Sequence, residues 1–590
     1  MSGIDIAATV LGVVPVAFKA AIEAWEILDD TLSYDGDTED LIIRLETVKA
    51  RLGIWAAKAG LTDGELRSPF HPVEELLERT MSRIRDLIIE VEQQGKKYGI
   101  VASVPSDSDS KRSTAAVAQM RRSLHSIMTS SRPKSNLVQL AAREASLQSG
   151  SRKSERSVSK RAYWAIHDKK KFEHFIDKLE QHVRGLQDLT VSTDRKEAQQ
   201  EGTRLALEIV RGLSQPEDLL RLQSLPESDN GLSQIDVSLL AQLKAIMQQR
   251  IPTIGARSTD TEDWSLAGSK PGDRAQTRFL KSGHLHSEAT YLFEKKEYDM
   301  NISDELKDLV RENIGKLVSL LGRSGSQQKL HTLQAVGYVD DPDFHCCWIV
   351  FQFPLGPVNL SALGLGTIEP LSLYDLFLSP TKPPLEVRYR LAKRIVETFA
   401  RLYGSGWMHK GINSKNIVFP QVYSLASVQS FASLQTALIQ GFNYSRQMTQ
   451  AQTIDRGKVL NDLESAIYRH PSYQGEAASG YQIHYDIYSL GLVLLEIALW
   501  SPLMSLLAAK HRPGKEPVVT LSPNMPSFHE IEAIELKRRV LLRVGSELAY
   551  RVGTKYKDIV QWCLDLKGPV TAIEFYNMVA IPLDELCGQG

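Results

Sequence analysis

The segment MHKGINSKNIVF, residues 408–419, begins a series of four motifs that decides the fold of the C-terminal half of the chain. The other three follow in order as LIQGFN at 438–443, YRHPSY at 468–473 and DIYSLGLVLLEI at 486–497. Upstream of them, strand-like patterns at 290–293 and 348–353 flank a helical pattern at 304–321, and mostly helical patterns follow to the end. A small strand-rich part followed by a helical part predicts an α+β domain with two lobes over residues 276–590.

The first part of the chain shows only helical periodicity. Apolar residues recur at helical spacing over 4–25, 41–55, 76–91 and 163–189, and strand-like alternation is absent from the first hundred residues. This pattern predicts an all-α helical bundle over residues 1–190. A brace and linker is expected over 191–275, with helices near 193–213 and 239–247. The predicted fold class is therefore multidomain, a helical bundle followed by a two-lobed α+β fold.

A basic, serine-rich segment at 103–161 interrupts the helical part. Between residues 111 and 161, twelve Lys and Arg residues stand against two acids. Anionic lipid attracts such a segment by about 1 kcal/mol for each basic residue near the surface, and a solvated loop without a partner is the alternative. The whole chain has a net charge of −1, so nucleic acid is not an expected partner.

The cysteines and the apolar N-terminus exclude several classes of protein. The four cysteines form no C-x-x-C pair, so we expect no metal site and no disulfide framework, as in a reducing cytosol. The charge-free run at 6–18 has 13 residues and contains a proline. Because a bilayer span needs about 20 apolar residues, no transmembrane helix is predicted.

The four C-terminal motifs resemble those of the protein-kinase fold, in the order in which kinases carry them. His409 matches the histidine of the catalytic loop, but Gly411 stands in place of the catalytic-base aspartate and Asn413 in place of the loop lysine. Asn416 matches the loop asparagine that holds a second magnesium ion, and Gly441 replaces the metal-binding aspartate. A single neutral amide does not hold Mg²⁺, which prefers carboxylates. The resemblance implies a pseudokinase without catalytic residues.

The strand-rich part also departs from the kinase pattern. The stretch FLKSGHLHSEATYLF, residues 279–293, contains a single glycine where kinases carry a glycine-rich loop over the phosphates. Lys296 is the candidate for the strand lysine, or Lys295 if the register shifts by one residue. Its usual partner would be Glu305 or Glu312, and the sequence does not decide between them.

Further expectations concern the cofactor and two polar residues of the fold. Lys296 and Asn416 are the candidate remnant of a nucleotide pocket; no cofactor is expected, and ATP binding is left open. His409 is interpreted as a packed, hydrogen-bonded core histidine rather than an acid or a base. Asp486 is expected to hold the catalytic-loop backbone through hydrogen bonds.

Two motifs mark the helical part, RLETVKARLGIW at 44–55 and WAIHDKKKFEHFID at 164–177. With these motifs, residues 1–190 resemble the HeLo domain of fungal incompatibility and cell-death proteins. This domain family also carries the name prion-inhibition and propagation. The resemblance implies a bundle that stays inert until a neighbouring domain triggers it, after which its N-terminal helix permeabilises membrane. An ordinary core helix is the alternative for that element. The candidate residues of the membrane-active helix are Ile6, Val10, Leu11, Val14 and Phe18.

The combination is similar to the mixed-lineage-kinase-domain-like executioners of necroptosis and their fungal counterparts. It implies a cell-death effector in which the pseudokinase controls a pore-forming bundle. The expected protein is cytoplasmic, and on activation it self-oligomerises and relocates to the anionic plasma membrane. The sequence does not give the upstream receptor or kinase. Candidate phosphate acceptors are Tyr444, Ser445, Thr449, Thr453 and Ser465.

Two other classes of function stay open. One is an active kinase or ATP-binding enzyme in which Asp455, Asp462 or Glu464 supplies the missing carboxylate. The other is a non-lytic signalling adaptor whose two parts only dock partners. Transfer of labelled γ-phosphate separates the first class from the pseudokinase hypothesis, and leakage of anionic liposomes separates the second from a lytic effector.

Overall fold

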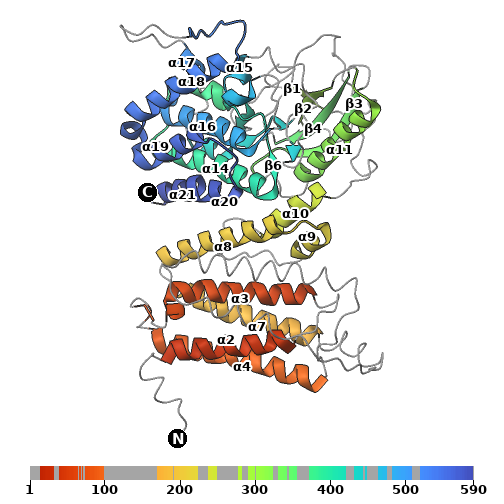
Figure 1. Cartoon of the computed structure of the whole chain (residues 1–590), viewed down its shortest axis with the longest axis vertical. Coiled ribbons are helices and arrows are strands. Elements are labelled where there is room, and N and C mark those ends of the chain that lie inside the picture. The colour runs from red at the N-terminus through yellow and green to blue at the C-terminus, as the bar shows by residue number, and fades with distance from the viewer. Residues whose placement is uncertain are drawn as a thin grey trace. The chain divides into compact units, whose positions relative to one another are not determined.

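The computed structural model divides the chain into two compact units, Met1–Gln248 and Gln249–Gly590 (Figure 1). The segment predicted as brace and linker contributes its helices to the first unit. The structure describes residues 13–31, 39–63, 66–67, 70, 73–98, 169–189, 192–223, 237–248, 277–281, 290–298, 301–322, 330–341, 345–354, 371–419, 431–442, 446–447, 463–474, 481–507 and 519–588.

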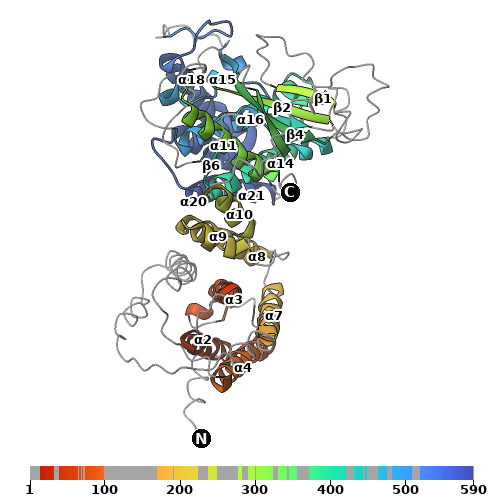
Figure 2. The ribbon, with the colours of Figure 1, turned by 90° about the vertical axis from the view of Figure 1, so that its right-hand side faces the viewer.

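The first unit is a helical bundle (Figures 1 and 2). Its long helices are α2 Val13–Thr31, α3 Glu39–Ala59, α4 Glu74–Tyr98 and α7 Lys169–Asp188, with a short 3₁₀ turn η1 at Leu61–Asp63. α2 packs against α4, and α7 packs against both α3 and α4. Because their apolar residues recur with the helical period, each helix turns one apolar face to the same interior.

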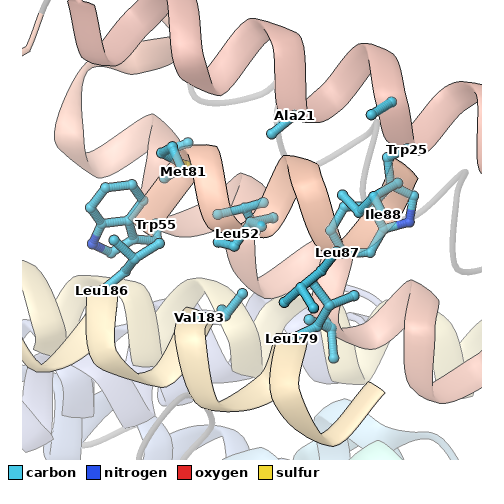
Figure 3. Close-up of a cluster of buried hydrophobic side chains, with 14 of the residues drawn as sticks. Ala21, Trp25, Leu52, Trp55, Met81, Leu87, Ile88, Leu179, Val183 and Leu186 are labelled. Carbon is cyan, nitrogen blue, oxygen red and sulfur yellow. The ribbon is translucent and has the colours of Figure 1, made fainter. Parts of the chain in front are cut away.

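The interior of the bundle is a single apolar cluster with contributions from all of these helices. Figure 3 shows labelled members of this cluster pointing into the shared space. Trp25 and Trp55 are among the largest fully buried side chains, and the ring of Trp55 meets Phe70 edge-on at 6.0 Å. Burying each such ring removes a large apolar area from water, so these residues contribute strongly to the stability of the bundle.

Three further helices of the first unit follow, α8 Ser192–Gly212, α9 Pro216–Gln223 and α10 Val237–Gln248. α8 contacts α3, where Nζ of Lys58 lies 2.6 Å from a carboxylate oxygen of Glu197. On α10, Lys244 donates to the carbonyl oxygens of Val210 (2.7 Å) and Arg211 (3.2 Å) at the end of α8. Burial, with a smaller effect of Arg211, lowers the pKa of Lys244 to about 8. These contacts join α8 to the bundle and α10 to α8.

The second unit begins with an antiparallel sheet whose strand order is β1-β2-β4-β3. The elements are β1 Thr277–Lys281, β2 Thr290–Glu297, α11 Asp304–Leu321, β3 Gln334–Asp341 and β4 Cys346–Phe353. α11 packs on β3 and β4, and Ser303 caps its first turn. Strands β2, β3 and β4 share a buried cluster that includes Tyr291, Phe293 and Trp348.

The rest of the second unit is mostly helical. Its helices are α13 Leu373–Phe377, α14 Leu385–Ser405, α15 Leu463–Ala466, α16 Ile483–Leu499, α17 Met504–Leu507, α18 Glu530–Arg543, α19 Ala549–Asp565, α20 Ala572–Phe575 and α21 Ile581–Cys587. Short strands join them, β5 Leu371–Ser372, β6 Trp407–Met408, β7 Ile417–Phe419, β8 Leu438–Ile439 and β9 Arg446–Gln447. Shorter helical turns are η6 Ser414–Asn416, η8 Phe431–Thr436, η11 Pro471–Tyr473, η12 Val544–Leu548 and η13 Tyr576–Ala580. Every residue of α16 is buried, so this helix is the centre around which the others pack.

The predicted fold class is confirmed, because a helical bundle is followed by an α+β unit with a strand-rich part and a helical part. The helix predicted at 304–321 is α11, and the two strand-like patterns fall in β2 and β4. Within the described residues, no helix is both long enough and apolar enough to cross a bilayer.

Candidate functional site

The C-terminal candidate residues come together where β6, η6, β7 and β8 meet in the second unit. The backbone turns after β6 at His409 and Lys410, continues through η6 into β7, and β7 pairs with β8. Gln440 N donates to the carbonyl oxygen of Asn416 at 2.9 Å, which holds the segment around 441 against the loop. Residues 408–419 and 438–442 therefore form one site in the described structure.

His409 is a core residue of this site. It is fully buried, its ring lies 4.5 Å from that of Phe442, and burial lowers its pKa to about 4. The N–H of Gly411 donates to its Nδ1 at 3.2 Å, so the proton lies on Nε2, which is 3.0 Å from the carbonyl oxygen of Gln440. A neutral imidazole with both nitrogens engaged supports the loop and is not positioned as a general base.

Asp486, near the start of α16, holds the backbone of the same loop through hydrogen bonds. Its carboxylate is fully buried and accepts from the backbone N–H groups of His409 (2.6 Å) and Lys410 (2.8 Å) and from the hydroxyl of Tyr481 (2.6 Å). Burial raises the pKa of Asp486, and these three hydrogen bonds act in the opposite direction. The predicted contact of Asp486 with the loop backbone is thus present.

Gly411 and Gly441, which the sequence resemblance matches to kinase aspartates, are packed against Asn416. A Cβ placed on Gly441 would lie 2.3 Å from Nδ2 of Asn416, and the φ of Gly441 is +87°, a region that side-chain-bearing residues rarely adopt. A Cβ on Gly411 would lie 3.1 Å from the carbonyl oxygen of Gly441. Asn416 Nδ2 also donates to the carbonyl oxygen of Gly411 at 2.6 Å. The amide of Asn416 therefore fills the space that a side chain at position 441 would need.

Asn413 acts on the backbone of the same turn. Its Oδ1 accepts from the N–H of Asn416 at 3.0 Å, and its Nδ2 donates to the carbonyl oxygen of Gly411 at 3.2 Å. A lysine at this position could not accept the bond from Asn416 N–H, since its ammonium group only donates. Among the described residues, no cluster of three or more His, Cys, Asp or Glu side chains has the arrangement of a metal site.

On strand β2, the residue that reaches the site is Glu294, which the sequence analysis did not single out. Its carboxylate accepts from the backbone N–H groups of Gly441 (2.7 Å) and Phe442 (2.9 Å). Lys295 lies 2.9 Å from Glu297 and 5.7 Å from the ring centre of Trp348. The signal that could have found Glu294 is an acid directly after the apolar run 291–293 in a buried strand.

The lysine and glutamate candidates of the strand-rich part occupy separate places. Lys296 lies on β2, opposite Cys347 of β4. Glu312 lies 2.8 Å from Lys316 in the same helix, α11, and Glu305 is exposed in the first turn of that helix.

The candidate membrane-active helix is represented by α2. Val14 is fully buried in the bundle core, and Phe18 is partly buried against it. Ile6, Val10 and Leu11 lie outside the described residues, as does the basic segment 103–161. In this structure the described part of the helix is thus a core element of the bundle.

The two motifs of the bundle meet at the seam between α3 and α7. Arg44 lies 2.8 Å from Asp177 and 3.5 Å from Glu180, and the mostly buried Glu180 also lies within 4.0 Å of Arg51. Burial lowers the pKa of Arg51; the neighbouring Arg184 and Arg44 add to this effect, and Glu180 opposes it. Glu180 of α7, three residues beyond the second motif, therefore joins two arginines of the first motif, which aligns the two helices.

Comparisons with known proteins agree with this division of the chain. Residues 6–222 match the HeLo family, whose description is prion-inhibition and propagation. The helical bundle of the first unit is thus similar to the HeLo family over this stretch. The match extends over α8 and most of α9, beyond the stretch 1–190 that carries the sequence resemblance.

No curated protein matches the chain. Among solved structures, one match is titled "Titin kinase and its flanking domains", with 12% sequence identity and a TM-score of 0.32. The match covers 53% of this chain and 44% of that chain, so it spans less than half the length of that structure. A TM-score of this size does not establish a shared fold.

Proposed function

We propose that this chain is a regulated cell-death effector in which a catalytically inactive kinase-like unit controls a HeLo bundle that permeabilises membrane. The HeLo match over residues 6–222 supports the first part of this proposal. The observation that carries the second part is that glycine stands at 441, where a phosphotransferase needs a carboxylate, and that the side chain of Asn416 occupies the space beside it.

Kinase catalysis consists of positioning and charge stabilisation, for which an aspartate base and a metal-binding aspartate are required. Glycine occupies both positions here, at 411 and 441. Of the acids considered as replacements, Glu464 is bonded to Lys415 and its side chain is about half exposed. Asp455 and Asp462 lie outside the described residues. We infer that the second unit acts through its shape, without a cofactor and without phosphoryl transfer.

The membrane step of the proposal concerns α2. An apolar helix face that is buried in a bundle is equally stable in the hydrocarbon region of a bilayer, because both environments exclude water. A change in the second unit would release this face, and the basic segment 103–161 would draw the bundle to anionic lipid of the plasma membrane. Several copies would then act together, since one short helix does not span a bilayer alone.

Leakage of a trapped dye from vesicles tests the lytic step. The fragment 1–248 should release dye from vesicles of phosphatidylserine and phosphatidylcholine, whereas the full chain without its trigger should not. Cutting at 248 keeps α8 and α10, which contact α3 and α8 respectively. A folded fragment that leaves these vesicles intact contradicts the lytic proposal and favours an adaptor.

A matched pair of variants assigns the leakage to the face of α2. Phe18→Asp places a charge on the partly buried face of α2 and should abolish leakage. Leu76→Asp changes a side chain of α4 that is 50% exposed and should leave leakage unchanged. Circular dichroism of both variants confirms that the bundle is folded. Equal loss of leakage in both variants would contradict the proposal that the buried face of α2 acts on the membrane.

Incubation of the full chain with γ-labelled ATP and Mg²⁺ tests the absence of catalysis. No label should reach the chain itself or a generic protein substrate, because neither catalytic carboxylate is present. Label transfer that is lost in Glu464→Gln would instead establish the unorthodox kinase.

A further inference from the structure

The contact between Glu294 and the segment at 441–442 has features that ordinary strand packing does not require. Glu294 is only 2% exposed, although it is a carboxylate on a strand, where it directly follows the apolar residues 291–293. Its two oxygens accept from two consecutive backbone N–H groups, Oε1 from Gly441 and Oε2 from Phe442. The partners are 147 and 148 residues away in the sequence. The contact thus joins the sheet to the helical part of the unit.

Burial of a carboxylate is unfavourable unless hydrogen bonds compensate for the lost water. Bonds from N–H groups to a charged acceptor are roughly twice as strong as those between neutral groups. A glutamine at 294 would offer one oxygen and would place an NH₂ group against the second N–H donor. The geometry therefore suits an anion and not merely a polar side chain.

The two N–H groups are held in place without help from Glu294. Gly441 has a positive φ and lies against Asn416, and Gln440 N donates to the carbonyl oxygen of Asn416. On the other side, the Phe442 ring is 1% exposed and packs on His409. Consecutive N–H groups fixed in such a turn form a typical anion-binding concavity.

We propose that the amides of Gly441 and Phe442 form an anion site, that Glu294 is its intramolecular ligand, and that this contact latches β2 to the segment after β8. When the Glu294 side chain is absent, the two amides would bind a polyphosphate or a similar multivalent anion. In the wild type, Glu294 occupies the site and excludes this ligand. This inference goes beyond the proposed cell-death function, because it concerns what occupies the site and not what the bundle does.

Hydrogen exchange of the full-length protein, followed by mass spectrometry, tests the latch. In Glu294→Ala, the amides of 441 and 442 should exchange roughly a hundredfold faster, because two bonds to a charged acceptor are lost. Glu297→Ala is the matched control, since Glu297 lies on the same strand and contacts Lys295. It should leave the exchange at 441 and 442 unchanged.

Inorganic pyrophosphate, added without metal, tests the anion site. At millimolar concentration it should slow the exchange of these amides again in Glu294→Ala and have no effect on the wild type. Unchanged exchange in Glu294→Ala overturns the proposal, and so does faster exchange that pyrophosphate does not reverse. If Glu294→Ala does not fold, Glu294→Ser, whose short side chain also leaves the site open, is judged by the same two results.

Discussion

The helical bundle and the α+β unit are stabilised in different ways. The interior of the bundle is one apolar cluster, and three buried acids of the first unit, Glu180, Glu201 and Asp218, form ion pairs with arginines. Three of the buried carboxylates of the α+β unit, Glu294, Asp486 and Glu496, instead accept at least two hydrogen bonds each from backbone N–H or hydroxyl groups.

The difference matters because apolar burial is non-directional, whereas hydrogen bonds need defined distances and angles. A bundle held by apolar contacts keeps most of its stability when its helices shift against one another. The same holds when an apolar face moves from the protein core into the hydrocarbon of a bilayer. A unit held by buried carboxylates has one favoured geometry and loses much stability when one partner is removed. Such a division suits a bundle that rearranges and a neighbouring unit that keeps a fixed shape.

The largest expected effect is that of Asp486→Asn in the α+β unit. The asparagine keeps the size of the side chain but sets an NH₂ group against donors from His409, Lys410 and Tyr481. Leaving two or three buried groups unsatisfied should cost about 4 kcal/mol of unfolding free energy. Hydrogen exchange of α16 measures the loss, and Asp565→Asn, at an exposed position of α19, is the control. A loss below about 1 kcal/mol would refute the dependence on buried carboxylates.

The next effect is a pH dependence that comes from Glu496. Its Oε1 accepts from Tyr468 (2.7 Å) and from the N–H of Leu503 (2.6 Å), and burial raises its pKa from 4.5 to about 7, against the effect of these bonds. Between these two values the folded chain binds a proton that the unfolded chain releases, so this group destabilises the fold increasingly as pH rises. The change amounts to roughly 3 kcal/mol between about pH 4.5 and about pH 7.

Urea unfolding of the wild type and of Glu496→Gln at both ends of this range measures the contribution. The stability of the variant relative to the wild type should increase with pH, because the glutamine side chain of the variant does not titrate. His409 acts in the opposite direction in both proteins, since its pKa is lowered to about 4 and its contribution is lost as pH falls from about 6.5. The difference between the two proteins removes the effect of His409, and a pH-independent difference would rule out titration of Glu496.

A smaller effect is expected for Leu52→Met in the bundle core. Leu52 is fully buried in the apolar cluster, and methionine has a similar volume without a polar group that needs a partner. The variant should lose about 1 kcal/mol, measured by hydrogen exchange of α3. The expected loss of unfolding free energy for this conservative change is thus smaller than the loss expected for Asp486→Asn. A loss as large as that of Asp486→Asn would erase the distinction between the two units.

The smallest effect is expected for Lys58→Ala, which removes the ion pair between α3 and α8. The Glu197 side chain is 53% exposed, so water and salt screen the pair. Thermal unfolding of the fragment 1–248 should change by about 0.5 kcal/mol or less, and the change should shrink at high salt. A larger loss would show that α8 depends on this pair rather than on apolar packing against α3.

The types of the main elements could be predicted from the sequence. The pattern at 304–321 gives α11 with its observed ends, and the patterns at 290–293 and 348–353 give parts of β2 and β4. These signals are local, since the period of apolar residues depends on neighbours within a few positions. The substitutions at 411 and 441 are likewise read directly from the sequence, because glycine cannot act as a carboxylate at any position.

Only the tertiary structure decided how these positions are filled. Asn416 occupies the space beside Gly441, and Glu294 reaches the amides of 441 and 442 from a strand that is 147 residues away. The burial of Val14 in the bundle core is also a tertiary result, because an apolar face in the sequence fits the core and the bilayer equally well. Sequence periodicity fixes which face of an element is apolar, whereas the partner of that face depends on contacts between distant segments of the folded chain.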